Sequence, residues 1–321
     1  MKERKIAEQN KILEIRSGSH LYGMTTKNSD EDYIGIFLAP IEYHLGLQKV
    51  EQVDLSIKDK LESGRNSKDA IDKTFYELKR FVKLALDNNP NILEVLFIDE
   101  KNIIYINEFG RRLLNLKQKF LSKKIIKTFL GYANSQKRKL ITKKANLDIL
   151  FRIKEFLEKF NLNEGIILPE LKEEPEFKEL FVVKSKDVYG IGEYNINKNI
   201  TIKEALKKIN EIIKNSSNRQ ELIKEYGYDT KFAYHLVRML LELYELITTN
   251  NLIFPLKYKD ILMKIKIGEV DIDTLFSTIS DIEMSINNVI DSKENLLKDK
   301  PNYDIIEKEL INIYKDFLII K

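Results

Sequence analysis

One stretch near the N-terminus, residues 16–38, constrains this chain more than any other part of the sequence. Gly18 and Ser19 follow an apolar run, and Asp30 and Asp32 stand one residue apart just before the apolar segment 33–38. That segment is β-prone and follows turn-forming residues, so the pattern predicts a strand. Because side chains alternate along a strand, the two aspartates should point to the same face.

Two carboxylates aimed at one place repel each other, and divalent cations with oxygen ligands are the simplest way to neutralise them. Gly18 allows the backbone to approach a bound group closely, and the Ser19 hydroxyl can donate a hydrogen bond to a phosphate oxygen. A turn that holds phosphate beside paired carboxylates is the equipment for Mg²⁺-assisted phosphoryl or nucleotidyl transfer. The alternative is a Gly/Ser turn followed by an acidic turn before an ordinary strand.

The stretch contains, in order, the blocks Gly18-Ser19, Tyr22-Gly23, Thr25 and Ser29-Asp30-x-Asp32. These blocks resemble the signature of the DNA polymerase β-like nucleotidyltransferase superfamily, and the fuller pattern is similar to the RNA-repair-pathway (RlaP-like) nucleotidyltransferases. The resemblance implies an α+β fold, with an N-terminal palm made of a mixed sheet and flanking helices, followed by a mainly helical domain. We expect a catalytic domain over residues 1–108 and a helical domain that closes the nucleotide cleft over residues 109–321.

A third carboxylate on a neighbouring strand completes the metal site in the enzymes that this chain resembles, and it can accept the proton of the attacking hydroxyl. By this resemblance we assign the role to Asp72, at the start of a segment that is expected to pass from a strand into a helix. Asp69 is the alternative, because the register of a strand is easily misjudged by a residue. A purely structural role for Asp72, as the cap of the following helix, is the other alternative.

The second informative segment, residues 226–240, predicts an apolar helix that begins near Asp229 or Thr230. Lys231, His235 and Arg238 fall at i, i+4 and i+7 on this helix, so they form one polar stripe. Lys and Arg at these positions suit the triphosphate of a nucleotide. The block also resembles the family pattern, which supports the assignment, and His235 would either contact phosphate or ribose or satisfy a buried backbone carbonyl.

A third block, Asn89-Pro90-Asn91-Ile92-Leu93-Glu94, is also similar to a family segment. It predicts a helix stop, a turn and a new helix start. Glu94 could orient a ligand or a basic side chain, and we favour a structural role in the core.

Twelve basic residues and no acidic residue lie between positions 111 and 144, although the whole chain carries a net charge of only +4. Such a block could follow a nucleic-acid backbone or receive a triphosphate. A pair of helices with solvated lysine faces is an equally good interpretation. The residues are Arg111, Arg112, Lys117, Lys119, Lys123, Lys124, Lys127, Lys137, Arg138, Lys139, Lys143 and Lys144.

The composition excludes several classes of site. The chain has no cysteine, which excludes disulfides, zinc–thiolate sites and cysteine nucleophiles, and fits a reducing cytoplasm. Only 3 histidines argue against a structural zinc site. No apolar run approaches the length needed to span a membrane, and the first residues do not resemble a signal peptide.

The expected reaction is transfer of a nucleoside monophosphate from an NTP, which we expect to be ATP, to a hydroxyl acceptor such as an RNA end, with release of pyrophosphate. Two Mg²⁺ ions, or Mn²⁺ in their place, would be held by Asp30, Asp32 and Asp72. Gly18 and Ser19 would hold a phosphate. Two alternatives stay open: a nucleotide- or RNA-binding regulator on the same fold, and a transferase that modifies a protein hydroxyl.

Overall fold

The protein folds into two compact units. The first unit comprises Met1–Ala133, Val237–Met263 and Ile279–Lys321, and the second comprises Asn134–Leu236 and Lys264–Thr278. The structure, a computed structural model, describes residues 2–25, 29–57, 71–160, 165–215, 223, 225–292 and 295–320.

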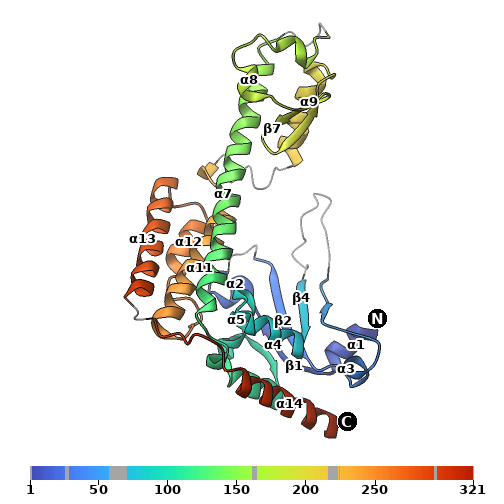
Figure 1. Cartoon of the computed structure of the whole chain (residues 1–321), viewed down its shortest axis with the longest axis vertical. Helices are drawn as coiled ribbons and strands as arrows, with labels where there is room; N and C mark the ends of the chain where they lie inside the picture. The colour runs from blue at the N-terminus through green and yellow to red at the C-terminus, as the bar shows by residue number, and fades with distance from the viewer. Residues whose placement is uncertain are drawn as a thin grey trace. The chain divides into compact units, whose positions relative to one another are not determined.

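A five-stranded mixed sheet forms the centre of the first unit (Figure 1). The strand order is β3-β4-β2-β1-β5, in which β2 and β4 run parallel and the other neighbouring pairs run antiparallel. The strands are β1 (Lys11–Arg16), β2 (Glu31–Phe37), β3 (Gln52–Asp54), β4 (Ile71–Glu77) and β5 (Ile103–Ile106).

The two faces of this sheet carry different side chains. Alternation along β2 places Asp32 and Ile36 on one face, together with their register partners on β4, which include Asp72. The other face carries Glu14 of β1 and Lys73 of β4, whose side chains form an ion pair at 2.8 Å. A small hydrophobic core also covers that face and is formed by Ala7, Phe37, Ala39, Tyr43, Val50, Val53 and Phe75.

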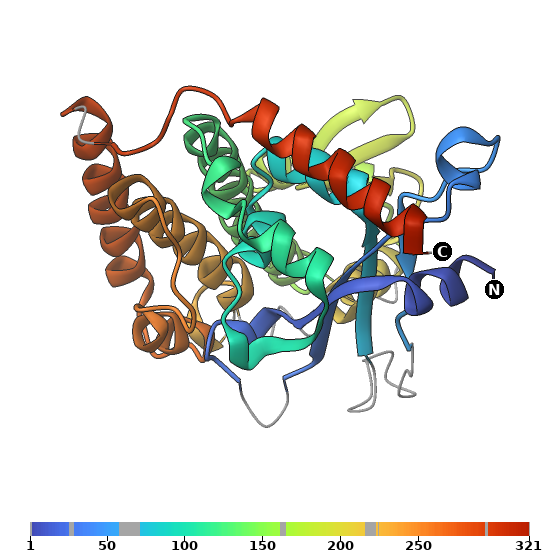
Figure 2. The ribbon, with the colours of Figure 1, turned by 90° about the horizontal axis from the view of Figure 1, so that it is seen from below.

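Helices from the N-terminal part of the chain pack on the sheet (Figure 2). Helix α4 (Leu78–Leu86) packs against β2 and β4 with its apolar face, and α1 (Lys2–Gln9) packs against β2 and β3. The sequence around Pro90 ends α4 and begins α5 (Pro90–Leu96), as the pattern predicted. The other helical segments of this unit are α2 (Gly18–Leu21), α3 (Glu42–Leu45), η1 (Glu100–Asn102), α6 (Glu108–Leu114), η2 (Lys117–Lys119) and α14 (Tyr303–Ile320).

Four long or medium helices contribute residues to both units: α7 (Lys124–Leu157), α11 (Thr230–Thr249), α12 (Lys259–Lys266) and α13 (Ile272–Asp291). None of the helices within the described ranges is long and apolar enough to cross a membrane.

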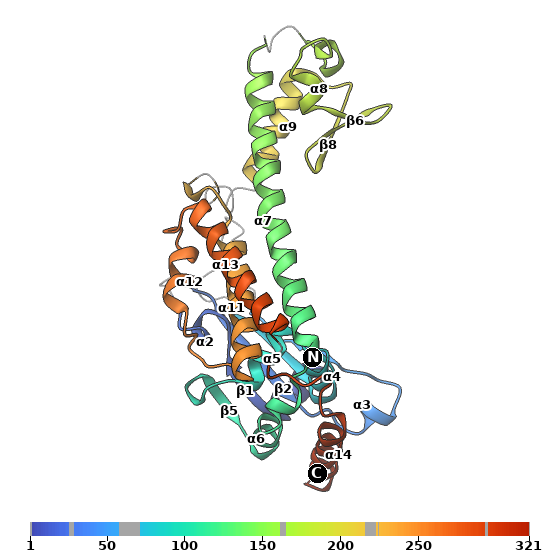
Figure 3. The same ribbon diagram turned by 60° about the vertical axis from the view of Figure 1, so that its left-hand side comes forward.

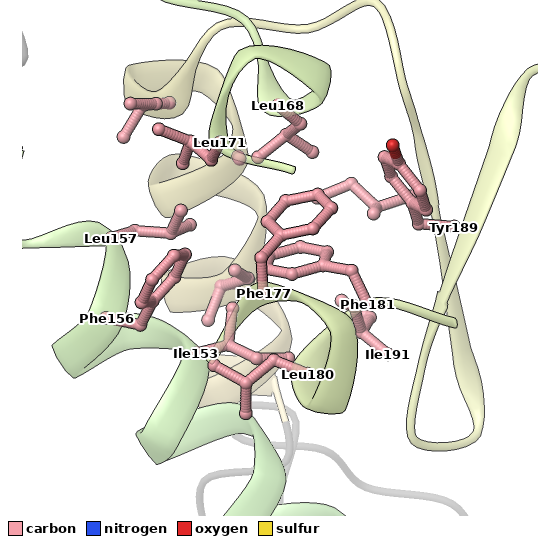
Figure 4. Close-up of a cluster of buried hydrophobic side chains, with 14 of the residues drawn as sticks. Ile153, Phe156, Leu157, Leu168, Leu171, Phe177, Leu180, Phe181, Tyr189 and Ile191 are labelled. Carbon is pink, nitrogen blue, oxygen red and sulfur yellow. The ribbon is translucent and has the colours of Figure 1, made fainter. Parts of the chain in front are cut away.

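The second unit (Figure 3) has a hydrophobic core of its own, formed by buried residues between positions 150 and 209 (Figure 4). The rings of Phe177 and Phe181 stack at 4.6 Å, and Tyr189 meets both rings edge-on at 5.3 and 5.8 Å. Aromatic pairs at such distances contribute about 0.5–1.5 kcal/mol beyond burial. The elements are η3 (Leu168–Leu171), α8 (Phe177–Leu180), β6 (Val182–Ser185), β7 (Val188–Ile191), β8 (Tyr194–Asn197) and α9 (Ile202–Asn215).

The predicted α+β class is confirmed: a mixed N-terminal sheet with flanking helices precedes a mainly helical region. The strand predicted over 33–38 is β2, which begins two residues earlier because Glu31 and Asp32 already pair with β4. The proposed division into domains 1–108 and 109–321 stays a prediction.

Candidate functional site

Two of the predicted carboxylates lie side by side in the sheet. Asp32 and Asp72 are directly paired in the parallel register of β2 and β4, so their side chains leave the same face of neighbouring strands, about 4.8 Å apart at the backbone. Asp30 lies just before β2, two residues from Asp32. The alternative third carboxylate, Asp69, lies outside the described residues. The strand register therefore brings together the pair that the sequence assigned to metal binding.

Asp72 does not cap the helix that follows its strand. The residue before α4 is Glu77, whose carboxylate accepts a hydrogen bond of 2.8 Å from the Lys79 backbone N–H. Asp72 is exposed and lies five residues earlier, near the start of β4. Its Oδ1 accepts a hydrogen bond of 3.2 Å from the hydroxyl of Ser56, a contact that the sequence did not predict. The capping alternative for Asp72 is therefore wrong.

The donor set fits a hard divalent cation, because carboxylate oxygens on one face are the ligands that Mg²⁺ and Mn²⁺ accept. Within the described ranges, no three acidic or histidine side chains converge closely enough to hold a metal ion. The proposed metal site at Asp32 and Asp72 is supported by the register of their strands and not by a complete set of ligands.

The predicted phosphate turn is the short helix α2, and it lies against Asp32. The backbone N–H of Ser17 donates to the Asp32 carbonyl at 2.8 Å. Gly18 has φ +61°, a conformation that favours glycine. A Cβ atom at Gly18 would lie 2.1 Å from Oδ2 of Asp32, so the turn can approach the carboxylate only because this residue is glycine. Ser19 follows in α2 and is half-buried.

Gly18→Ala should lower the free energy of unfolding by at least about 1–2 kcal/mol, because alanine is strained at positive φ and its methyl group would clash with Asp32. Gly131→Ala is the matched control. Gly131 lies inside α7, where an added Cβ meets no atom within 4 Å, so alanine should stabilise the chain by about 0.5–1 kcal/mol. Urea denaturation of both variants measures the difference, and equal effects would contradict this geometry.

The three residues of the predicted polar stripe, Lys231, His235 and Arg238, all lie on α11, but their environments differ. Asp229 caps the helix, since its Oδ1 accepts the backbone N–H groups of Lys231 and Phe232 at 3.1 and 3.2 Å. Lys231 is exposed and His235 is half-buried, and both belong to the second unit. Arg238 belongs to the first unit and is only 4% exposed.

Arg238 lies in a buried cluster of charged groups. Its Nη1 bonds to Oε1 of Glu94, from α5, and at 2.9 Å to Oε1 of Glu242, one turn further along α11. The hydroxyl of Tyr22 donates to Oε2 of Glu94 at 2.6 Å, and the guanidinium lies 4.4 Å from the centre of the Tyr22 ring. The prediction that Arg238 contacts a triphosphate stays untested, and this geometry favours a different role.

Two carboxylates share one guanidinium in this cluster. Burial raises the pKa of Glu242 well above its ordinary value, the Arg238 charge opposes that rise, and the Glu94 charge adds to it. The raised pKa favours a protonated Glu242 in the folded chain. The sequence allowed Glu94 to orient a basic side chain, but it did not indicate Tyr22 or Glu242 as partners.

The basic segment 111–144 is partly neutralised by acidic residues from distant parts of the chain. Arg112 bonds to Glu309 and Asp316 of α14, each at 2.6 Å. Lys123 pairs with Asp299 at 2.6 Å, and Lys124 pairs with Asp87 at 2.7 Å. These residues do not form the uncompensated block that the local sequence suggested. Lys137, Arg138 and Lys139 lie in the part of α7 that belongs to the second unit, and the side chain of Lys143 lies outside the described residues.

Comparison with known proteins supports the predicted family. Residues 2–157 match the family described as "RlaP: RNA repair pathway DNA polymerase beta family". An uncharacterised 38.9 kDa protein in the nrdC-mobD intergenic region of Enterobacteria phage T4 is 26% identical over 332 residues, which cover 96% of this chain and 95% of the relative. A crystal structure of a nucleotidyltransferase-like protein from Exiguobacterium sibiricum 255-15 aligns over 91% of this chain and 73% of its own, at 10% identity and a TM-score of 0.26. The match over residues 2–157 confirms the expected resemblance to the RNA-repair-pathway nucleotidyltransferases.

Proposed function

We propose that this chain, whose residues 2–157 match the RNA repair pathway DNA polymerase β family, transfers a nucleoside monophosphate from ATP to a hydroxyl group of an acceptor, with an RNA end as the preferred acceptor. The observation that carries the proposal is the direct register pairing of Asp32 with Asp72, beside a glycine turn that contacts Asp32. We place the reaction in the cytoplasm, which a chain without cysteine suits.

Asp30 and Asp32 would hold one divalent cation, and Asp72 would share a second, with Mg²⁺ or Mn²⁺ as the metal. A cation bound there would offset the charge of the triphosphate and lower the pKa of the acceptor hydroxyl. Asp72, exposed at the start of β4, would accept the proton of that hydroxyl. The acceptor oxygen then bonds to the α-phosphorus, the bond to the bridging oxygen breaks, and pyrophosphate leaves.

Ser19 would donate a hydrogen bond to a phosphate oxygen. Its turn can lie close to the Asp32 carboxylate because residue 18 is glycine. Lys231 would offset charge on the terminal phosphates, with His235 at phosphate or ribose. We give the terminal phosphates to Lys231 and not to Arg238, because the Arg238 guanidinium is buried between two carboxylates.

Lys231→Ala should weaken ATP binding in the presence of Mg²⁺ by about tenfold or more, since a hydrogen bond to a charged group contributes about 1.5–3 kcal/mol. Stability should change by less than about 0.5 kcal/mol, because Lys231 is exposed. Lys203→Ala, on the exposed side of α9, is the control and should bind ATP as the parent does. Calorimetric titration measures all three proteins, and an unchanged affinity for Lys231→Ala would remove this residue from the site.

The proposal that RNA is the acceptor relies on the basic segment 111–144 and can be tested separately from ATP binding. If Lys137, Arg138 and Lys139 contact phosphates, their triple alanine variant should lower the salt dependence of RNA binding by about two units of slope. The matched control replaces three exposed lysines of α9, Lys203, Lys207 and Lys208, and should leave that slope unchanged. Fluorescence anisotropy at several salt concentrations gives the slopes. Equal slopes in all three proteins would favour a protein acceptor, which labelled ATP and cell protein would then reveal.

A further inference from the structure

The buried cluster around Arg238 consists of three charged side chains that the proposed reaction does not use, namely Glu94, Arg238 and Glu242. We propose that Glu94, Arg238 and Glu242 form a positioning element that fixes Gly18 and Ser19 beside Asp32, acting through Tyr22. The catalytic part of this inference rests on the proposed function, whereas its structural part does not.

The first step runs from the cluster to Tyr22. Glu94 accepts the Tyr22 hydroxyl at one carboxylate oxygen and binds Arg238 with the other, while Arg238 lies over the Tyr22 ring. Glu242 holds the same guanidinium from one turn along α11. Contacts therefore constrain both the hydroxyl group of Tyr22 and the face of its ring. The Tyr22 side chain is held in one orientation in addition to being buried.

The second step runs from Tyr22 to α2. The backbone N–H groups of Tyr22, Gly23 and Met24 donate to the carbonyl oxygens of Gly18, His20 and Ser19, at 3.2, 3.2 and 2.8 Å respectively. Leu21 and Met24 are fully buried on either side of Tyr22. Movement of Tyr22 would therefore displace the helix that carries Ser19.

The third step runs from α2 to the metal carboxylates. Ser17 donates its N–H to the Asp32 carbonyl, and Gly18 lies so close to the Asp32 carboxylate that no Cβ atom fits between them. One end of the four-residue α2 is therefore tied to Asp32 and the other end to the cluster. This arrangement fixes the distance between the phosphate turn and the carboxylates.

Stability alone is a weak explanation for such a cluster. A buried ion-pair triad is often no more stable than hydrophobic side chains of similar volume, because each charge loses its hydration. Its bonds are directional, however, and displacement of a catalytic group by about 1 Å can lower a rate about 100-fold.

The test uses two tyrosine–glutamate pairs in the same unit, one buried and one partly buried. Tyr22 donates to Glu94 beside α2, and Tyr314 donates to Glu77 at the far end of β4 from Asp72. Tyr22→Phe and Tyr314→Phe each remove one hydroxyl and keep the ring. We expect Tyr22→Phe to speed hydrogen exchange of the Gly23 and Met24 amides at least about tenfold, and Tyr314→Phe to leave them unchanged. Unchanged exchange in Tyr22→Phe would overturn the inference, whether or not the protein transfers nucleotides.

A double-mutant cycle tests the catalytic part, at a temperature at which all variants are folded. Tyr22→Phe should lower kcat/KM about tenfold in the parent and less than about twofold in a Ser19→Ala background, because both changes act on the same turn. Tyr314→Phe should have no effect in either background. Equal, additive losses for Tyr22→Phe in both backgrounds would mean that Tyr22 is merely structural. If the parent transfers no nucleotide, the proposed function fails, and the exchange measurement still decides the positioning role.

Discussion

Arg238→Met should lower the free energy of unfolding by about 3–5 kcal/mol, because it leaves the buried Glu94 carboxylate without its counter-charge. Methionine keeps most of the volume of the arginine side chain, so lost packing contributes little. The matched control is Lys231→Met, two turns earlier on α11, where the side chain is exposed and the change should stay below about 0.5 kcal/mol. Urea denaturation measures both. Similar small losses in the two variants would mean that the Arg238 pairing contributes nothing.

The same cluster predicts a pH dependence of stability that arises from Glu242. Glu242 has a raised pKa in the folded chain, so the folded state binds its proton more tightly than the unfolded state does. The parent should therefore lose stability as the pH rises above the ordinary pKa of a glutamate, and Glu242→Gln, which mimics the protonated form, should lack that loss. At neutral pH we expect Glu242→Gln to change the unfolding free energy by less than about 1 kcal/mol. A loss as large as that of Arg238→Met would show an ionised Glu242.

Asp32→Asn and Asp72→Asn should each lower nucleotidyl transfer more than about 100-fold, because an amide is a poorer ligand for Mg²⁺ and carries no charge. Glu31→Gln is the matched control. Glu31 stands between Asp30 and Asp32 and is the first residue of β2, on the opposite face of the sheet from Asp32, where Tyr33 donates to its carboxylate. Its replacement should leave transfer within about twofold of the parent. If both asparagine variants transferred nucleotides at the rate of the parent, the metal-binding role of Asp32 and Asp72 would be contradicted.

Measurements of stability with and without metal distinguish a metal-binding role of Asp32 and Asp72 from a purely structural one. In EDTA, Asp32→Asn and Asp72→Asn should be at least as stable as the parent, since each removes one of two neighbouring like charges. Mg²⁺ with ATP should raise the melting temperature of the parent, because both bind only the folded state, and should do little for the variants. Thermal unfolding with and without Mg²⁺ and ATP provides the comparison.

The part of the site that is local in sequence could be predicted. The turn at Gly18 and Ser19, the strand after Asp32 and the cap at Asp229 all depend on residues within a few positions of one another. The resemblance also pointed to Asp72 as a third carboxylate, and the capping of α4 by Glu77 excludes a role for Asp72 as a helix cap.

Long-range pairing could not be predicted in this way. In the sequence, Arg238 is one of three basic residues on a polar stripe that suits a triphosphate, and its partner Glu94 stands 144 residues away. Arg112 reads as part of an uncompensated basic block, and its partners lie on the last helix, about two hundred residues later in the chain. A periodic pattern reports which face of a helix is polar, but it does not reveal which charged groups the fold brings to that face.

The most direct measurement of the central claim is incubation of the protein with α-labelled ATP, Mg²⁺ and RNA, with both the label on the RNA and the released pyrophosphate recorded. The account predicts one pyrophosphate released for each labelled nucleotide incorporated by the parent, and neither product in EDTA or with Asp32→Asn. Parallel incubation with cell protein in place of RNA identifies the acceptor class. Absence of both products from the parent with every acceptor and NTP, or equal incorporation by the parent and Asp32→Asn, would contradict the assignment of Asp30, Asp32 and Asp72 as the metal site of a nucleotidyltransferase.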